Sequence, residues 1–163
     1  MATLYSYTST NNNTGWNWNG ANDNGAVSFT PTITWIPTQL IWRNFSVSWT
    51  PIVDIYIKSD KTDASTTYAQ ALWVTMTSGT NTINLTPMWQ INSGTRYWVY
   101  MKRISNVSNF FRFYNEYTSP PSEQYWRSSA SNIDPDIRYD SWSKNIGASM
   151  DIKWNLTSKG LKF

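Results

Sequence analysis

The stretch TGWNWNGANDNG, residues 14–25, combines residue types that can bind a sugar. The flat indole of Trp16 or Trp18 can cover the apolar C–H face of a pyranose ring, while nearby amides and carboxylates hydrogen-bond to its hydroxyl groups. The candidate glycan-binding residues of this stretch are Trp16, Asn17, Trp18, Asn22 and Asp23. The alternative is that both rings close an open end of the hydrophobic core, and the sequence does not decide between the two.

A second cluster of the same residue types follows later in the chain. Its candidate glycan-binding residues are Gln124, Tyr125, Trp126, Arg127, Tyr139 and Trp142. The alternative is that these rings close the open ends of the fold or pack between subunits, since most of the 11 tryptophans in 163 residues must be structural.

Catalysis has few candidate groups in this chain. Cysteine and histidine are both absent, which removes thiolate nucleophiles and imidazole bases. Hydrolysis of a glycosidic bond would need two carboxylates about 5 to 9 Å apart. The carboxylates available near the second cluster are Glu116, Glu123, Asp134, Asp136 and Asp140. These carboxylates lie in or beside a long loop, where solvated carboxylates are ordinary. We therefore expect no enzymatic activity and no cofactor.

Other ligand classes are also disfavoured. Asp60 and Asp63, or Asp23 with its asparagines, could offer oxygen ligands to Ca²⁺, but their spacing matches no calcium loop, so we expect no metal. The net charge is only +3 and no basic run exceeds Lys102-Arg103, which argues against nucleic acid. No apolar run reaches the roughly 18 residues that span a bilayer.

Alternating apolar and polar residues predict half-buried strands, because successive side chains of a strand point to opposite faces. The predicted strands are residues 3–8, 25–30, 39–49, 53–58, 71–76, 80–85, 95–103, 109–117 and 149–158. The side chains expected in the core are Val53, Ile55, Ile57, Leu72, Val74, Met76, Tyr97, Val99, Met101, Met150, Ile152, Trp154 and Leu156.

The chain length and the turn signals predict one all-β domain covering residues 1–163, a sandwich or barrel of about eight or nine strands. Prolines and Ser-Gly-Thr turns separate the strands, and no stretch has an apolar stripe of helical period. Two long segments, residues 9–24 and 118–144, show no pattern and are expected to be loops. Loops of this length are often functional.

The outer side of residues 95–103 is unusually aromatic. Trp98 and Tyr100 alternate with the inward-pointing residues, and Trp73 competes with other tryptophans for space in the core. Exposed aromatic patches usually mark contacts with partners, and interfaces are enriched in Trp and Tyr. We therefore expect Trp98, Tyr100 and Trp73 to form an interface with copies of this chain or with another protein.

The order of several motifs resembles that of jelly-roll, carbohydrate-binding-like β-sandwich modules of surface and secreted proteins. The matching stretches are AVSFTP (26–31), VDIYIKSD (53–60), INLTPMWQINSGTRYWVYM (83–101), NFFRFYN (109–115), YDSWSKN (139–145) and MDIKWNL (150–156). The resemblance covers about residues 25–158. It implies a jelly-roll β-sandwich of two antiparallel sheets with a ligand-binding or assembly role, and it carries no catalytic residues to this chain.

The surface composition suggests a protein that faces the outside. Charged residues make up only 14% of the chain, which has five Asn-x-Ser/Thr sequons, beginning at Asn12, Asn44, Asn84, Asn106 and Asn155. The first 15 residues lack the basic and apolar regions of a secretory signal. We therefore expect a structural or surface protein of a virus particle, a role that is compatible with binding host glycans. The alternative is a secreted carbohydrate-binding module.

Overall fold

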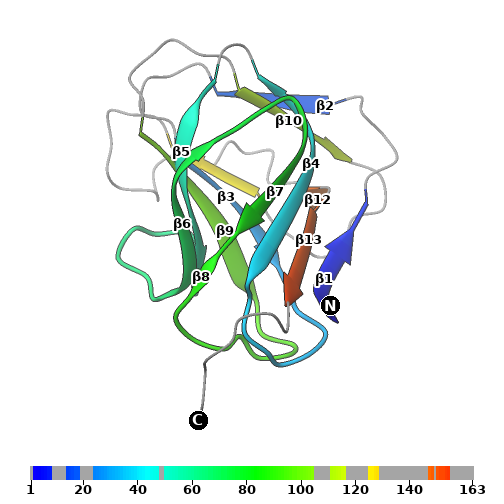
Figure 1. Cartoon of the computed structure of the whole chain (residues 1–163), viewed down its shortest axis with the longest axis vertical. Helices are drawn as coiled ribbons and strands as arrows, with labels where there is room; N and C mark the ends of the chain where they lie inside the picture. The colour runs from blue at the N-terminus through cyan, green and yellow to red at the C-terminus, as the bar shows by residue number, and fades with distance from the viewer. Residues whose placement is uncertain are drawn as a thin grey trace.

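The structure, a computed structural model, describes residues 2–8, 14–18, 24–47, 50–104, 111–116, 125–128, 147–148 and 150–154. Within these ranges the chain forms β-strands and no helix, and the strands make two antiparallel sheets. The sheets face each other as the two layers of a sandwich (Figure 1). The predicted all-β sandwich of two antiparallel sheets is confirmed, while its jelly-roll topology stays a prediction.

Sheet A contains seven strands. Its order is β1 (Ala2–Tyr7), β13 (Met150–Trp154), β4 (Gln39–Val47), β10 (Phe111–Glu116) and β12 (Gly147–Ala148), with β7 (Gly79–Asn84) beside β4 and β2 (Thr14–Trp18) beside β10. The first and last described strands of the chain, β1 and β13, are therefore neighbours.

Sheet B contains six strands. Its order is β11 (Tyr125–Ser128), β3 (Asn24–Phe29), β9 (Tyr97–Arg103), β5 (Ile52–Lys58), β6 (Thr67–Thr75) and β8 (Thr86–Pro87). The central strands β9 and β5 are apolar toward sheet A and polar or aromatic on the other side, so sheet B has two chemically distinct faces.

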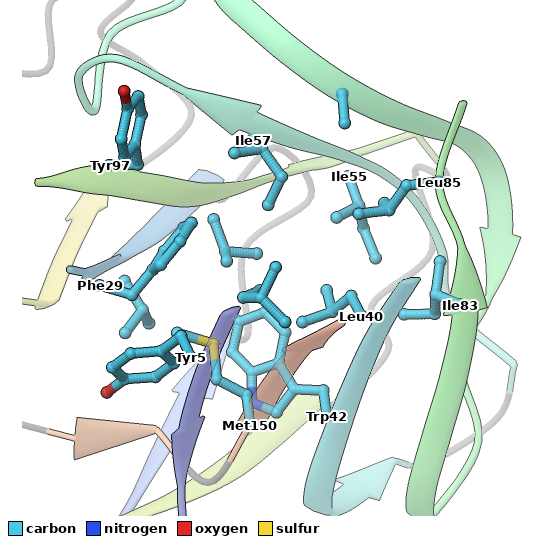
Figure 2. Close-up of a cluster of buried hydrophobic side chains, with 14 of the residues drawn as sticks. Tyr5, Phe29, Leu40, Trp42, Ile55, Ile57, Ile83, Leu85, Tyr97 and Met150 are labelled. Atoms are coloured by element: carbon cyan, nitrogen blue, oxygen red, sulfur yellow. The ribbon is translucent and has the colours of Figure 1, made fainter. Parts of the chain in front are cut away.

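The core lies between the two sheets. Figure 2 shows Trp42 and Leu40 of β4, together with Met150 of β13, facing Ile55 and Ile57 of β5. All five side chains are fully buried. Burying one such side chain stabilises the fold by about 1.5–3 kcal/mol. The burial of these side chains is therefore the main interaction that holds the two sheets together.

Every segment predicted as a strand contains one in the structure. Most of the side chains expected in the core, from Val53 through Ile152, are buried or packed against it. Trp154 is partly buried against the core, and Leu156 lies outside the described residues. The alternation of apolar and polar residues therefore located both the strands and their inner faces.

Leu72 is the exception, because it is 49% exposed. The register of β5 against β6 shifts between Val53 and Ile55, which leaves Leu72 and Trp73 together opposite Asp54. This β-bulge inserts one extra residue and breaks the period of two on which the prediction depended. The prediction that Leu72 points into the core is therefore wrong.

Segments 9–24 and 118–144 are predicted to be loops, but each of them contains a short strand. Strand β2 lies within the first and pairs with β10, and strand β11 lies within the second and pairs with β3. These strands have only 5 and 4 residues, too few to show a clear alternation. Their backbone hydrogen bonds come from strands that are distant in sequence, which local patterns do not reveal.

A cluster of charges fastens the outer side of sheet A. Asp151 of β13 is buried and accepts hydrogen bonds from Arg43 Nη1 at 3.1 Å and from Ser6 Oγ at 2.7 Å. A second guanidinium nitrogen of Arg43 reaches the other carboxylate oxygen, and Lys153 Nζ lies 3.5 Å from it. The cluster joins β1, β13 and β4 through a single carboxylate.

The pKa of Asp151 reflects this environment. Burial acts to raise the pKa, but hydrogen bonds from Arg43 and Ser6 and the charges of Arg43 and Lys153 lower it below its ordinary value. A carboxylate with a lowered folded-state pKa stabilises the fold above its unfolded-state pKa. That stabilisation is lost as the pH falls through the folded-state value.

Asp151→Asn is expected to lower the free energy of unfolding by about 1–3 kcal/mol at neutral pH, because two cations lose their buried partner. Wild type should itself become less stable as Asp151 is protonated, so the difference between the two proteins should shrink at low pH. Denaturant unfolding at pH 7 and pH 3 checks this. The control is Asp60→Asn, at an exposed aspartate, which should change little. A difference from wild type that is the same at both pH values would contradict the assignment.

Candidate functional site

The two predicted glycan-binding clusters lie in different sheets. Trp16, Asn17 and Trp18 belong to β2, which extends sheet A beside β10. Tyr125, Trp126 and Arg127 belong to β11, at the edge of sheet B. Strand pairing therefore does not bring the clusters together. The other predicted members, Asn22, Asp23, Gln124, Tyr139 and Trp142, lie outside the described residues, as do Glu123, Asp134, Asp136 and Asp140.

The side of sheet B turned away from the core, here called the outer face of sheet B, carries a polar and aromatic array. Strand β5 contributes Asp54, Tyr56 and Lys58, and strand β9 contributes Trp98, Tyr100 and Lys102. Strands β5 and β9 are antiparallel, and their register places Asp54 opposite Lys102, Tyr56 opposite Tyr100 and Lys58 opposite Trp98. The motif VDIYIK predicts this array, since its alternation places an aspartate, a tyrosine and a lysine on one face.

Lys58 is the buried cation of this face. Its Nζ lies 5.2 Å from the ring centre of Tyr100 and 5.7 Å from that of Tyr56, within cation–π range. Nζ also donates to the backbone carbonyls of Thr62 at 2.9 Å and Asp63 at 2.6 Å. Burial, and secondarily the charge of Lys102, lowers the pKa of Lys58 against the opposing effect of Asp63. Lys58 thus fastens the β5–β6 loop, residues 59–66, to the outer face of sheet B.

The two tyrosines of the face are hydrogen-bond donors at neutral pH. Tyr56 donates to Asp54 Oδ2 at 3.2 Å, and burial followed by the negative charge of Asp54 raises the pKa of Tyr56 to about 12. Burial also raises the pKa of Tyr100, with a further contribution from Asp63. Both phenols therefore keep their protons, and neither is a candidate base.

Trp98 and Tyr100 lie on the outer face of sheet B, as the alternation predicts, but they are only 6% and 2% exposed. The expectation that they form an exposed interface is therefore wrong. Trp98 and Tyr100 pack together with Ala26, and Asp63 of the β5–β6 loop reaches Tyr100. A loop that folds back over a sheet leaves no local pattern in the sequence, so the approach of Asp63 to Tyr100 could not be predicted.

Trp73, the third predicted interface residue, is 68% exposed. It has φ of 57°, in the left-handed region, and is the only non-glycine residue with a positive φ in the described part of the chain. For a bulky residue this conformation costs about 1–2 kcal/mol. An exposed ring does not recover that cost by packing in the core.

A second exposed aromatic surface lies at one end of the sandwich. We call it the end surface and define it by Ile33, Trp35, Met88 and Trp89, of which Trp89 is 62% exposed. Its residues come from the β3–β4 loop and from the segment between β8 and β9, which both lie at the lower end in Figure 1, away from β2 and β10.

Hydrogen bonds hold the two segments of the end surface together. Trp35 and Ile91 exchange backbone hydrogen bonds of 3.0 and 2.8 Å, and Ser93 Oγ donates to the carbonyl of Thr32 at 2.8 Å. The Trp35 ring packs 4.5 Å from that of Trp154, measured between ring centres. The end surface is therefore built on a fixed framework.

The end surface is also nearly uncharged. Residues 30–38 and 85–96 contain one charged residue, Arg96. The sequence prediction did not include Ile33, Met88 or Trp89. A usable signal was present, because the apolar pair Met88-Trp89 follows Pro87 in a turn-rich stretch where buried residues are not expected.

The described ranges contain no group of three or more His, Cys, Asp or Glu residues placed to hold a metal ion. In the same ranges, no helix is long and apolar enough to cross a membrane.

Lys58→Met is expected to lower the free energy of unfolding by about 1–3 kcal/mol, because two loop carbonyls lose their donor. Amide exchange of residues 59–66 should speed up more than that of the core strands. The matched control is Lys102→Met, since Lys102 is 44% exposed and its 3.6 Å ion pair with Asp63 is worth at most about 1 kcal/mol. Equal effects of the two substitutions would show that Lys58 does not fasten the loop.

Comparison of this chain with protein-family models, with curated proteins and with solved structures finds no match in any of the three. The case for a function therefore rests on the residues of this chain, chiefly the end surface and the bulge at Leu72 and Trp73.

Proposed function

We propose that this chain is a non-enzymatic structural protein of a virus particle, a jelly-roll sandwich that assembles with copies of itself through the end surface. The observation that carries the proposal is the exposure of Trp35, Trp89, Ile33 and Met88 on two hydrogen-bonded segments at one end of the sandwich. Apolar surface that a monomer exposes to water favours association, because its burial against a partner is energetically favourable.

The pairing of the main strands supports the jelly-roll part of the proposal. Along the chain, β1 pairs with β13, β3 with β9, β4 with β7 and β5 with β6. This nesting is that of one long hairpin folded over itself, which distributes eight strands over two sheets as in a jelly roll. Jelly rolls occur in viral capsid domains and in lectin domains. The topology is therefore compatible with both candidate functions and does not choose between them.

The chemistry of the end surface favours protein assembly. Interface centres are depleted in charge and enriched in Trp and Met, and this surface shows the same composition. Two copies, each of formal charge +3, repel weakly overall, and only Arg96 adds charge in the segments that carry the surface. The fixed framework around Trp35 also limits the conformational entropy lost on docking.

The placement on a virus particle rests on the composition and on the topology together. A low content of charged residues, abundant Asn, Ser and Thr and many aromatic side chains suit a subunit that both packs against neighbours and faces the outside. The second candidate function is that of a secreted carbohydrate-binding module. One observation favours it, the exposed indole of Trp73 beside the polar outer face of sheet B.

The purified chain is expected to self-associate in a concentration-dependent way, and Trp89→Ser is expected to weaken this association by roughly 30-fold, the effect of removing a central interface tryptophan. Sedimentation equilibrium measures both. Thermal unfolding should show that the variant stays folded, because Trp89 is mostly exposed. Trp73→Ser is the matched control and should associate like wild type.

Wild type that stays monomeric at millimolar concentration would contradict self-assembly. Association of the Trp89→Ser variant with wild-type affinity would show that the contact lies elsewhere on the molecule.

A further inference from the structure

The bulge at Leu72 and Trp73 is held in place by a buried carboxylate. The backbone N–H of Trp73 donates to Asp54 Oδ1 at 2.8 Å, and the Tyr56 hydroxyl donates to Asp54 Oδ2 at 3.2 Å. Asp54 itself is buried in the centre of sheet B, where its register partner on β9 is Lys102. Each oxygen of the carboxylate thus has a donor, and one of these donors fixes the left-handed turn.

The fold gains little packing from an indole at this position, because Trp73 is 68% exposed. Glycine adopts the left-handed conformation without strain, whereas tryptophan does so at a cost. Trp73 is the most exposed of the large apolar side chains in the described residues, so core packing does not compensate the strain. Strained residues that the surroundings hold in place cluster at sites of function. A strained, exposed and anchored tryptophan is therefore a candidate contact residue.

The surroundings of the bulge indicate what it contacts. The outer face of sheet B carries two carboxylates, Asp54 and Asp63, and two ammonium groups, Lys58 and Lys102. Among the described residues of this face these four charges balance, which favours a neutral ligand over an acidic or phosphorylated one. Asp63 and Lys102 remain 46% and 44% exposed, so they can still hydrogen-bond to a ligand.

We infer that the bulge is a binding site for a neutral pyranose saccharide, with the Trp73 ring as its stacking face. An indole covers the apolar face of one sugar ring, and exposed donors and acceptors beside it satisfy the hydroxyl groups. A single ring bordered by charges is a small target for a protein, whose contact centres are larger and apolar. The glycan-binding role of Trp16 and Trp18 stays a separate prediction.

This site is separate from the end surface. Trp89 is hydrogen-bonded through its backbone to Tyr68 at the start of β6, and Trp73 lies five residues further along the same strand. At about 3.3 Å per residue the two anchoring points are roughly 16 Å apart. Saccharide binding and assembly can therefore be tested independently, with one variant for each site.

The decisive variant is Trp73→Gly, which removes the ring and also the strain. It is expected to unfold at a denaturant concentration equal to or above that of wild type, since glycine accepts a positive φ. Binding should weaken about tenfold or more with loss of the stacking face. The probes are cellohexaose, maltohexaose, chitohexaose and mannopentaose, titrated by calorimetry at millimolar concentration, with sialyllactose as the charged comparison.

Asp54 acts as a positioning residue in this proposal. Asp54→Asn keeps an acceptor for the Trp73 N–H and should retain saccharide binding, whereas Asp54→Ala should lose it. Trp89→Ser should bind saccharide like wild type, and Trp73→Gly should sediment like wild type. These two results together keep the saccharide site distinct from the assembly surface.

Three results would overturn the inference. Wild type that binds none of the four neutral saccharides would exclude this ligand class. Undiminished binding by Trp73→Gly would show that the ring is not the platform. A clear loss of stability in Trp73→Gly would show that the indole serves the fold, and that its strain needs no ligand to explain it.

Discussion

The packing of sheet A against sheet B around Trp42 is the contact on which the rest of the structure depends. Trp42 and Leu40 of β4 meet Ile55 and Ile57 of β5, and all four are fully buried. Each strand that takes part must keep one apolar face, so its alternate residues are left for the outer faces. The charge cluster at Asp151 and the array at Asp54 both occupy positions that this alternation leaves over.

The outer faces are stabilised by different means because their chemistry differs. On sheet A one buried carboxylate joins three strands through Arg43, Ser6 and Lys153. On sheet B one buried ammonium, that of Lys58, holds a loop through two carbonyls and rests against two tyrosine rings. In both cases the buried charge has several partners, as burial requires.

Periodicity predicted what is local and missed what depends on distant contacts. The strands and the inward residues of β5, β9 and β13 followed from alternation alone, as did the placement of Trp98 and Tyr100 on an outer face. The burial of those two rings could not be predicted, since it depends on packing with Ala26 and on a loop that turns back to Tyr100. The exposure of Leu72 depends on a bulge, and nothing in ALWVTM indicates one.

The candidate site shows the same division. Aromatic residues amid Asn and Gly drew attention to the segments around Trp16 and Trp126, where residue type is suggestive. Trp73 was expected at an interface on grounds of surplus apolar area, yet its distinguishing features are a positive φ and a hydrogen bond to Asp54. A positive φ cannot be inferred from residue types, because most tryptophans in strands have ordinary backbone geometry.

The link between the core and the bulge explains how the fold tolerates strain at its edge. Asp54 sits between Val53 and Ile55, two residues fully committed to the core, so its carboxylate has little freedom to move away from the Trp73 N–H. The apolar packing of β5 thus fixes the position of the acceptor, and the acceptor fixes the turn. The end surface depends on a different framework, the Trp35–Ile91 pairing. A sandwich organised in this way keeps two exposed aromatic sites on independent frameworks, an uncharged one at its end and an indole with an anchored backbone at its side.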